Sequence, residues 1–191
     1  MLRRALARYN SALSARPLLT KAATGGTLSA AGDGVAQLST TGDRGFDTYR
    51  LAGFSAFGLL YVGVFNHYWF NWLAQRFPGQ HARAAITKVG LQQFVANPLA
   101  YVPALYGING VASGQSPTEI ATKINDEYSE VMLKLWQTWI PSSLFQFFFV
   151  PPQYHVLWAA GVGFGWNVFL STFYYRTEFI IGAQDTPTPY K

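Results

Sequence analysis

The sequence predicts an all-α membrane protein: a polytopic helix bundle with four or five transmembrane helices and an N-terminal amphipathic helix. Only 12% of its 191 residues are charged, against roughly 25% in soluble proteins. Aromatic residues make up 17% of the chain and 18 residues are glycine, as closely packed membrane helices require. We expect an Arg-rich targeting or interfacial helix over 1–16, a transmembrane helical bundle over 17–180 and an extended C-terminal tail over 181–191.

The first segment, residues 1–16, is rich in arginine and contains no acidic residue. Its apolar side chains recur at helical spacing, at Leu2, Leu6, Tyr9 and Leu13. This pattern is typical of a mitochondrial targeting segment. It also suits a helix that lies on the membrane surface and is never removed. A retained signal would satisfy both interpretations.

The first expected span, 17–40, carries two neighbouring stripes of small or polar residues. The packing stripe consists of Ala22, Gly26, Ala30 and Gly34, and the polar stripe of Gly25, Ser29, Asp33 and Gln37. Facing lipid, Asp33 would cost about 2.5–3.5 kcal/mol, so we expect it to face the bundle interior. Asp33 and Gln37 could line a water-filled path or bind a cation or proton. We favour the alternative, a helix–helix hydrogen bond that fixes the bundle register.

The second expected span, 51–75, lies between Arg50 and Arg76 and contains no charged side chain. We expect Asp47 to cap its N-terminus. Asn66 and His67 are candidates for a polar lining within it. A histidine bonded to a neighbouring backbone group is the favoured alternative for His67.

The third expected span, 89–118, should be kinked or interrupted by Pro98 and Pro103. A re-entrant or broken helix is the alternative. Gln92 and Gln93 are further candidates for polar lining. The loop before this span supplies the candidates for binding lipid head groups, including cardiolipin: Arg76, Arg83 and Lys88.

The longest uncharged block runs from 135 to 175. Ser116 and Glu119 form a capping box that starts an amphipathic helix leading into it. The hinge residues Pro151 and Pro152 should divide the block into two embedded helices. Gly161 and Gly165 then form a packing face.

The net charge of +5 favours a membrane surface over nucleic acid, because most basic residues stand before or between the apolar blocks. The chain contains no cysteine, which excludes disulfides and thiolate chemistry. Its three histidines have no metal-ligand spacing and no nucleophile elbow is present. We therefore expect no cofactor, no metal and no enzyme activity. The basic N-terminus and the 76–88 loop should lie on the matrix side.

Short motifs spread over most of the chain resemble one family. In the N-terminal half they fall at Tyr9, Leu13, Pro17, Gly32, Asp33, Gln37, Gly63, His67, Trp69 and Leu73. In the C-terminal half they fall at Lys88, Leu91, Gln93, Pro98, Trp136, Trp139, Phe147, Val150, Pro151, Trp166, Asn167, Leu170 and Ser171. By these motifs the chain resembles the Mpv-seventeen family, which includes the peroxisomal twenty-two-kilodalton membrane protein.

The resemblance implies a multi-pass organellar membrane protein, most often of the mitochondrial inner membrane and sometimes peroxisomal. Pore formation is the main activity proposed for the family. Within the C-terminal signature the chain departs from the family's proline, glutamine, asparagine and arginine, which are replaced by Ile140, Ser143, Gln146 and His155. Such departures remove polar or charged groups from embedded positions, and so favour packing over conduction.

Two functions remain open from the sequence. We favour a non-catalytic accessory subunit of an inner-membrane assembly, such as a respiratory complex or ATP synthase, with membrane lipids and other membrane subunits as partners. The alternative is a pore or transporter component that moves small solutes or ions across an organellar membrane.

Overall fold

The computed structural model describes residues 2–40, 45–166, 168 and 169. The described part of the chain is helical throughout, apart from turns, and holds no strand, which confirms the all-α prediction. The tail expected at 181–191, and the end of the bundle expected to reach 180, lie outside the described residues.

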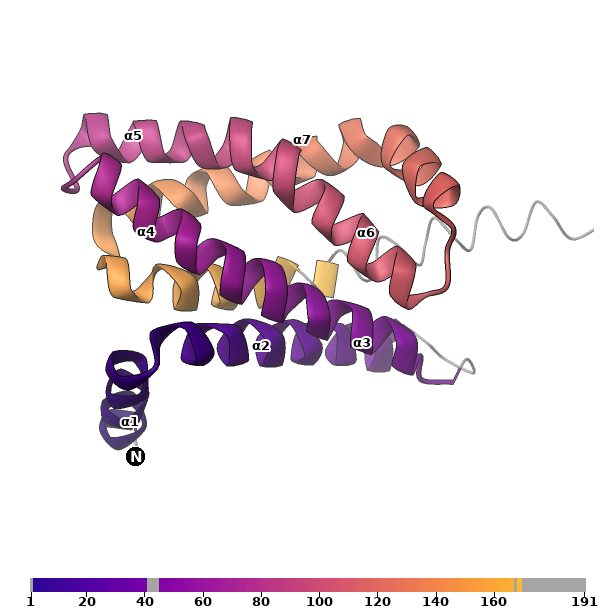
Figure 1. The fold of residues 1–191 in the computed structure, drawn as a ribbon, viewed down its shortest axis with the longest axis horizontal. Helices are drawn as coiled ribbons and strands as arrows, with labels where there is room; N and C mark the ends of the chain where they lie inside the picture. Colours follow the sequence, from indigo (N-terminus) through magenta and orange to yellow (C-terminus); the bar gives the residue numbers. More distant parts are fainter. Residues whose placement is uncertain (1, 41–44, 167, 170–191) are drawn as a thin grey trace, which may run out of the picture.

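Helices α1 (Leu2–Ala15) and α2 (Pro17–Thr40) meet at a sharp corner. Pro17 has no N–H to continue the hydrogen-bond ladder of α1, so it ends that helix and begins the next. As a result α1 runs across the end of the bundle, whereas α2 runs along it (Figure 1). Leu13 is buried, while Arg4 and Arg8 on the same helix are exposed.

Two long helices follow, each built from three segments. The first comprises α3 (Thr48–Phe57), the π-helical η1 (Gly58–Phe65) and α4 (Asn66–Arg76). The second comprises α5 (Ala82–Leu91), the π-helical η2 (Gln92–Tyr101) and α6 (Val102–Ala112). Both run without a break in the helical backbone.

The chain stays helical through Pro98 and Pro103, so the interruption considered from the sequence is absent. Pro98 lies within η2, and Pro103 lies in the first turn of α6. A wider π-helical turn accommodates the missing N–H and the bulk of a proline ring. Pro103 directly follows these π-helical turns, so the same local widening accommodates its ring.

Helix α7 (Pro117–Phe149) starts at the predicted capping box and ends at the predicted double proline. Val150 leaves the helical conformation, with φ −91° and ψ 127°. The short 3₁₀ helix η3 (Pro152–Tyr154) then leads into a helix over residues 155–166. The amphipathic start and the uncharged block before the hinge thus form one continuous helix.

Among the described residues, length and composition single out one helix able to cross a membrane, Thr48–Arg76, with a mean hydropathy of 1.2. The expected count of four or five crossings is therefore not confirmed. The other long helices carry buried polar side chains such as Asp33, Gln93 and Gln146, and these side chains reduce the mean hydropathy of each helix.

The interior contains two buried apolar clusters. One lies where the Thr48–Arg76 helix, α6 and α7 meet, and includes Phe57, Tyr101 and Leu135. The other lies between α4, α5 and the end of α7, and includes Leu73, Ala85 and Phe147. Helix α2 packs closely along η1 on the side of the Thr48–Arg76 helix away from α7 (Figure 1).

Candidate functional site: a polar cavity inside the bundle

The centre of the bundle encloses a cavity of about 30 Å³. Since about 10–15 Å³ on this measure holds one water molecule, the cavity has room for about two. No acidic or basic side chain lines it among the described residues. The polar lining consists of Ser29, Tyr61, Asn66, Gln92, Asn97, Tyr101, Trp139, Ser143, Gln146 and Trp166.

Four polar atoms of this lining are buried without a hydrogen-bond partner among the described residues. They are the Tyr61 hydroxyl, Asn66 Oδ1, Trp139 Nε1 and Gln146 Nε2. Tyr61 and Asn66 are 5% exposed and Gln146 is 2% exposed. Buried polar atoms are nearly always paired, so four unpaired ones around one cavity indicate that a polar guest belongs there.

The helices bring these groups to the cavity from two sides. Tyr61 lies in η1 and Asn66 begins α4, so both oxygens come from the Thr48–Arg76 helix. Trp139 and Gln146 come from α7. The unpaired atoms on the two sides therefore differ: oxygens from the Thr48–Arg76 helix and N–H groups from α7.

One flank of the cavity is held by an amide cluster, which we define as Gln92, Gln93, Asn97 and Ser143. Asn97 Nδ2 donates to Gln93 Oε1 at 2.7 Å, and Gln93 Nε2 donates to Ser143 Oγ at 2.9 Å. Gln92 Nε2 lies 3.3 Å from Asn97 Oδ1. These bonds join η2 to α7 and fix the amide orientations. Gln92 faces the cavity, whereas Gln93 is fully buried between the helices.

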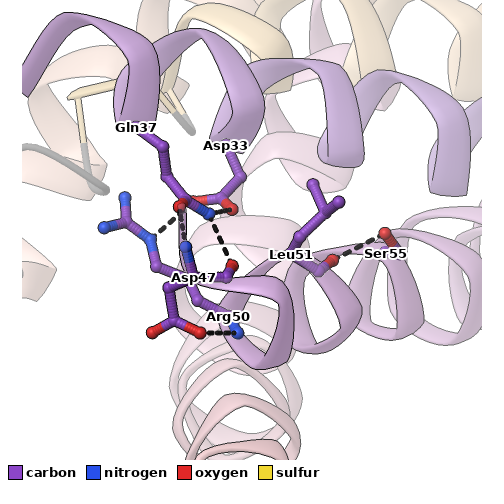
Figure 2. Close-up of polar contacts among 6 residues, drawn as sticks. All are labelled: Asp33, Gln37, Asp47, Arg50, Leu51 and Ser55. Atoms are coloured by element: carbon purple, nitrogen blue, oxygen red, sulfur yellow. Dashed lines mark hydrogen bonds and ion pairs between the residues drawn. The ribbon is translucent and has the colours of Figure 1, made fainter. Parts of the chain in front are cut away.

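Asp33 and Gln37 lie away from the cavity, in a cluster that joins α2 to the start of α3 (Figure 2). Arg50 Nε donates to Asp33 Oδ1 at 2.6 Å, and Gln37 Nε2 donates to Asp33 Oδ2 at 2.7 Å. Gln37 also exchanges two hydrogen bonds with the backbone of Asp47, at 2.7 and 2.9 Å. This is the geometry of a register-fixing contact between helices.

The caps expected at two helix starts are present. Asp47 Oδ1 accepts from Arg50 N at 3.0 Å and caps α3 (Figure 2). Ser116 N donates to Glu119 Oε2 at 2.7 Å, and Glu119 N donates to Ser116 Oγ at 3.3 Å. The Ser116 hydroxyl also donates to Glu119 Oε2, at 2.7 Å. The bonds from this hydroxyl and from Ser116 N stabilise the Glu119 carboxylate, so its pKa lies below the ordinary value. Both helix starts are thus fixed locally.

The favoured interpretation of His67, a bond to neighbouring backbone, is wrong. Its Nδ1 lies 3.2 Å from Lys21 Nζ, and its Nε2 lies 3.4 Å from Asn71 Nδ2. The sequence did not reveal Lys21 as its partner because 46 residues separate them. His67 does not line the central cavity.

The three candidates for binding lipid head groups differ in exposure. Arg76 and Arg83 are exposed, whereas Lys88 is 4% exposed and donates from Nζ to Gly79 O at 2.8 Å. Burial lowers the pKa of Lys88. Its ammonium stabilises the turn between α4 and α5, so only the two arginines are accessible to a head group.

The glycine faces also differ from expectation. A Cβ at Gly26 would make ordinary contact with Leu59, at 3.5 Å, whereas Gly34, Gly161 and Gly165 have no described atom within 4 Å of that position. The closest helix contacts fall instead on the neighbouring stripe. A Cβ at Gly25 would overlap the backbone of Gly58.

The hinge is a compact turn. Pro151 and Pro152 are both exposed. His155 Nε2 and Gln80 Nε2 lie 2.9 and 3.1 Å from the carbonyl oxygen of Val150, which joins the hinge to the α4–α5 turn. No group of three metal-ligating side chains gathers anywhere in the described ranges.

Sequence reasoning identified Asn66 and Gln92 of the cavity lining but not Tyr61, Asn97 or the α7 residues. Those on α7 did leave a signal. Trp139, Ser143 and Gln146 are spaced i, i+4, i+7 and therefore share one helix face. Tyr61 and Asn97 left none, because the wide turns of η1 and η2 shift the faces that regular helical spacing predicts.

These features define a class, an all-helical membrane protein with an uncharged polar cavity at its centre. The profile of the Mpv17 / PMP22 family matches residues 110–171. PXMP2/4 family protein 1 of Dictyostelium discoideum is 30% identical over 86% of this chain and 81% of its own length. The chain belongs to the Mpv17 / PMP22 family, as its motifs indicated.

Two further relatives are named for their membranes. Mitochondrial inner membrane protein Mpv17 of Caenorhabditis briggsae is 28% identical over 85% of this chain and 89% of its own. Peroxisomal membrane protein 2 of Bos taurus is 26% identical over 89% of each chain. No solved structure matches the chain.

Proposed function

We propose that the chain is a non-catalytic pore or transporter component that moves small polar solutes across an organellar membrane. One observation carries this proposal: four buried, unpartnered polar atoms surround a cavity at the centre of the bundle. A purely structural bundle has no need of such a cavity, since unpaired buried polar groups cost free energy.

Two departures from the family motifs now support conduction rather than packing. Ser143 and Gln146 stand where the family carries glutamine and asparagine, and both line the cavity. They exchange one neutral hydrogen-bonding group for another, so the polar character of the lining is kept. We therefore favour a pore or transporter component over the accessory subunit that the sequence favoured.

The location is the mitochondrial inner membrane, the membrane named for the Mpv17 relative, with the peroxisomal membrane of the Bos taurus relative as the alternative. A non-catalytic role is supported by the chemistry of the lining. Amides, a phenol and an indole offer hydrogen bonds but no general base paired with a nucleophile.

Reconstitution tests the proposal. Purified protein in liposomes should speed the efflux of water and urea relative to protein-free vesicles. Gln146→Leu, which replaces a cavity amide by an apolar side chain of similar size, should reduce that flux. Gln137→Leu changes an exposed glutamine on the same helix and should not. Absence of any flux from the folded wild-type protein would contradict the proposal.

A second candidate function, an accessory subunit of a respiratory complex or ATP synthase, is favoured by one surface feature. A groove of about 460 Å³ is lined by Val150, Tyr154, Leu157, Trp158, Gly161 and Val162. Beside it Gly161 and Gly165 leave room for a close helix. Membrane subunits, or lipids such as cardiolipin, could fill it.

Native gels in mild detergent distinguish this candidate. Gly161→Leu should release the chain from a larger assembly without unfolding it, because a Cβ added at this position meets no described atom within 4 Å. Migration of the wild-type chain only as a small monomer would contradict an accessory role.

A further inference from the structure

We infer that the central cavity selects neutral, water-sized solutes that carry both a hydrogen-bond donor and an acceptor, and that it excludes ions. This inference rests on the proposed function and names its substrate class. Water is the smallest such solute, and the cavity volume of about 30 Å³ accommodates about two molecules of it.

The arrangement of the unpartnered atoms carries the inference. On the α7 wall, Trp139 Nε1 and Gln146 Nε2 are donors. On the opposite wall, Asn66 Oδ1 accepts, and the Tyr61 hydroxyl can donate or accept. A guest satisfies both walls only if it accepts from α7 and donates to Asn66.

Neither a cation nor an anion can satisfy the donors on α7 and the acceptor on Asn66 together. A cation prefers a shell of oxygens, and the two N–H groups would point their positive ends at it. An anion prefers donors and would meet Asn66 Oδ1. Neither would find a compensating charge, because every described side chain that lines the cavity is neutral. An ion that enters such a site loses hydration free energy, and the neutral groups of the site do not compensate for this loss.

The buried charged residues Lys21, Asp33, Arg50 and Lys88 all lie outside the cavity lining. The carboxylate of Asp33 is paired with Arg50 at 2.6 Å and lies outside the lining. The ammonium of Lys88 is held by Gly79 O in the α4–α5 turn.

Binding can be tested separately from transport. In detergent micelles, the indole N–H of Trp139 should show an NMR cross-relaxation signal from a long-lived water molecule. Trp139→Phe assigns the resonance, and Asn66→Leu should weaken the water signal because one wall loses its acceptor. If Trp139 shows no bound water in the folded wild-type protein, the inference is overturned.

Selectivity is tested in liposomes by stopped-flow light scattering and ion flux. The wild-type protein should raise water permeability several-fold over empty vesicles and leave potassium and chloride fluxes at the protein-free level. Tyr61→Phe should lower the water permeability, because it removes one hydroxyl and keeps the ring. Gln137→Leu serves as the matched control.

The possible outcomes distinguish the proposed transport from the proposed selectivity of the cavity. Ion flux that rises together with water flux overturns the selectivity but leaves a pore. Bound water at Trp139 without any flux overturns the proposed transport but leaves the binding site. Introducing a charge with Asn66→Asp should admit potassium if the path crosses the membrane. Unchanged water permeability in Tyr61→Phe and Gln146→Leu together would also overturn the assignment of the site.

Discussion

At the scale of single residues, the pairing of Asp33 with Arg50 resolves what would otherwise be a costly buried charge. Asp33 is fully buried and Arg50 is 5% exposed. Their side chains come from different helices, 17 residues apart in the chain. The pair therefore joins α2 to α3 and stabilises the fold only while both members are present.

Breaking the pair should destabilise the protein strongly. We expect Asp33→Leu to cost about 3–5 kcal/mol, because it leaves the Arg50 guanidinium without its carboxylate. The double variant Asp33→Leu with Arg50→Met should recover much of this loss. Thermal unfolding in mild detergent measures both effects. Glu130→Gln is the control, because it removes a surface ion pair in which Glu130 Oε1 lies 3.7 Å from Lys134 Nζ. It should change the stability by less than about 1 kcal/mol. Equal effects of the single and double variants would contradict the pairing.

The capping box gives a residue-level prediction on pH. Since hydrogen bonds from Ser116 lower the pKa of Glu119, the folded protein binds fewer protons there than the unfolded chain. Its stabilising effect is complete above the ordinary glutamate value and is lost as the pH falls through the lowered pKa. Ser116→Ala should raise the Glu119 pKa towards that ordinary value, as measured by NMR titration. An unchanged pKa would show that the cap is not its cause.

At the scale of elements, the closest helix contact is that between α2 and η1. The backbones approach at Gly25, Gly58 and Gly63, where any Cβ would overlap the opposite helix. Glycine is required here for space rather than for an unusual backbone angle. This contact places η1, and with it Tyr61, against the cavity.

Gly63→Ala should therefore destabilise the bundle by about 1–3 kcal/mol, because the new methyl group forces the helices apart. Gly34→Ala is the matched control on α2. No described atom lies within 4 Å of its Cβ position, and alanine is favoured over glycine in a helix by up to about 1 kcal/mol. Unfolding midpoints that fall equally in both variants would contradict the packing described here.

The sequence predicted the elements better than the contacts between them. Caps and prolines act locally, so the starts of α3 and α7 and the turn at Pro151 could be placed from neighbouring residues alone. The partners of Asp33 and His67 could not, because they lie on other helices. Asn66 and Gln92 were recognised as embedded polar groups. That they share a cavity with Tyr61 depends on π-helical turns, which shift the helix faces away from those of the regular 3.6-residue period.

At the scale of the whole molecule, the two ends of the bundle differ in charge. The end with the α4–α5 turn carries Arg76 and Arg83, and the end with the α6–α7 turn carries Glu119 (Figure 1). Basic loops are enriched on the inner side of a membrane, which for the mitochondrial inner membrane is the matrix side. The α4–α5 turn should therefore face the mitochondrial matrix.

Cysteine labelling tests this orientation, since the natural chain has none. His81→Cys, in the α4–α5 turn, should react with an impermeant maleimide only from the matrix side. Ser113→Cys, before the α6–α7 turn, should react only from the other side. Both residues are exposed, so reactivity reports access alone. Labelling of both from one side would rule out a crossing between them.

The length of α7 has a mechanical consequence. Its 33 residues extend about 50 Å, some 20 Å more than the hydrocarbon core of a bilayer. The charged first half packs against α6, where the Tyr106 hydroxyl donates to Glu127 Oε2 at 2.6 Å, while the second half carries Ser143 and Gln146 at the cavity. A molecule that binds the charged half from outside would therefore act through one continuous helix on both its α6 contact and the cavity wall that carries Gln146.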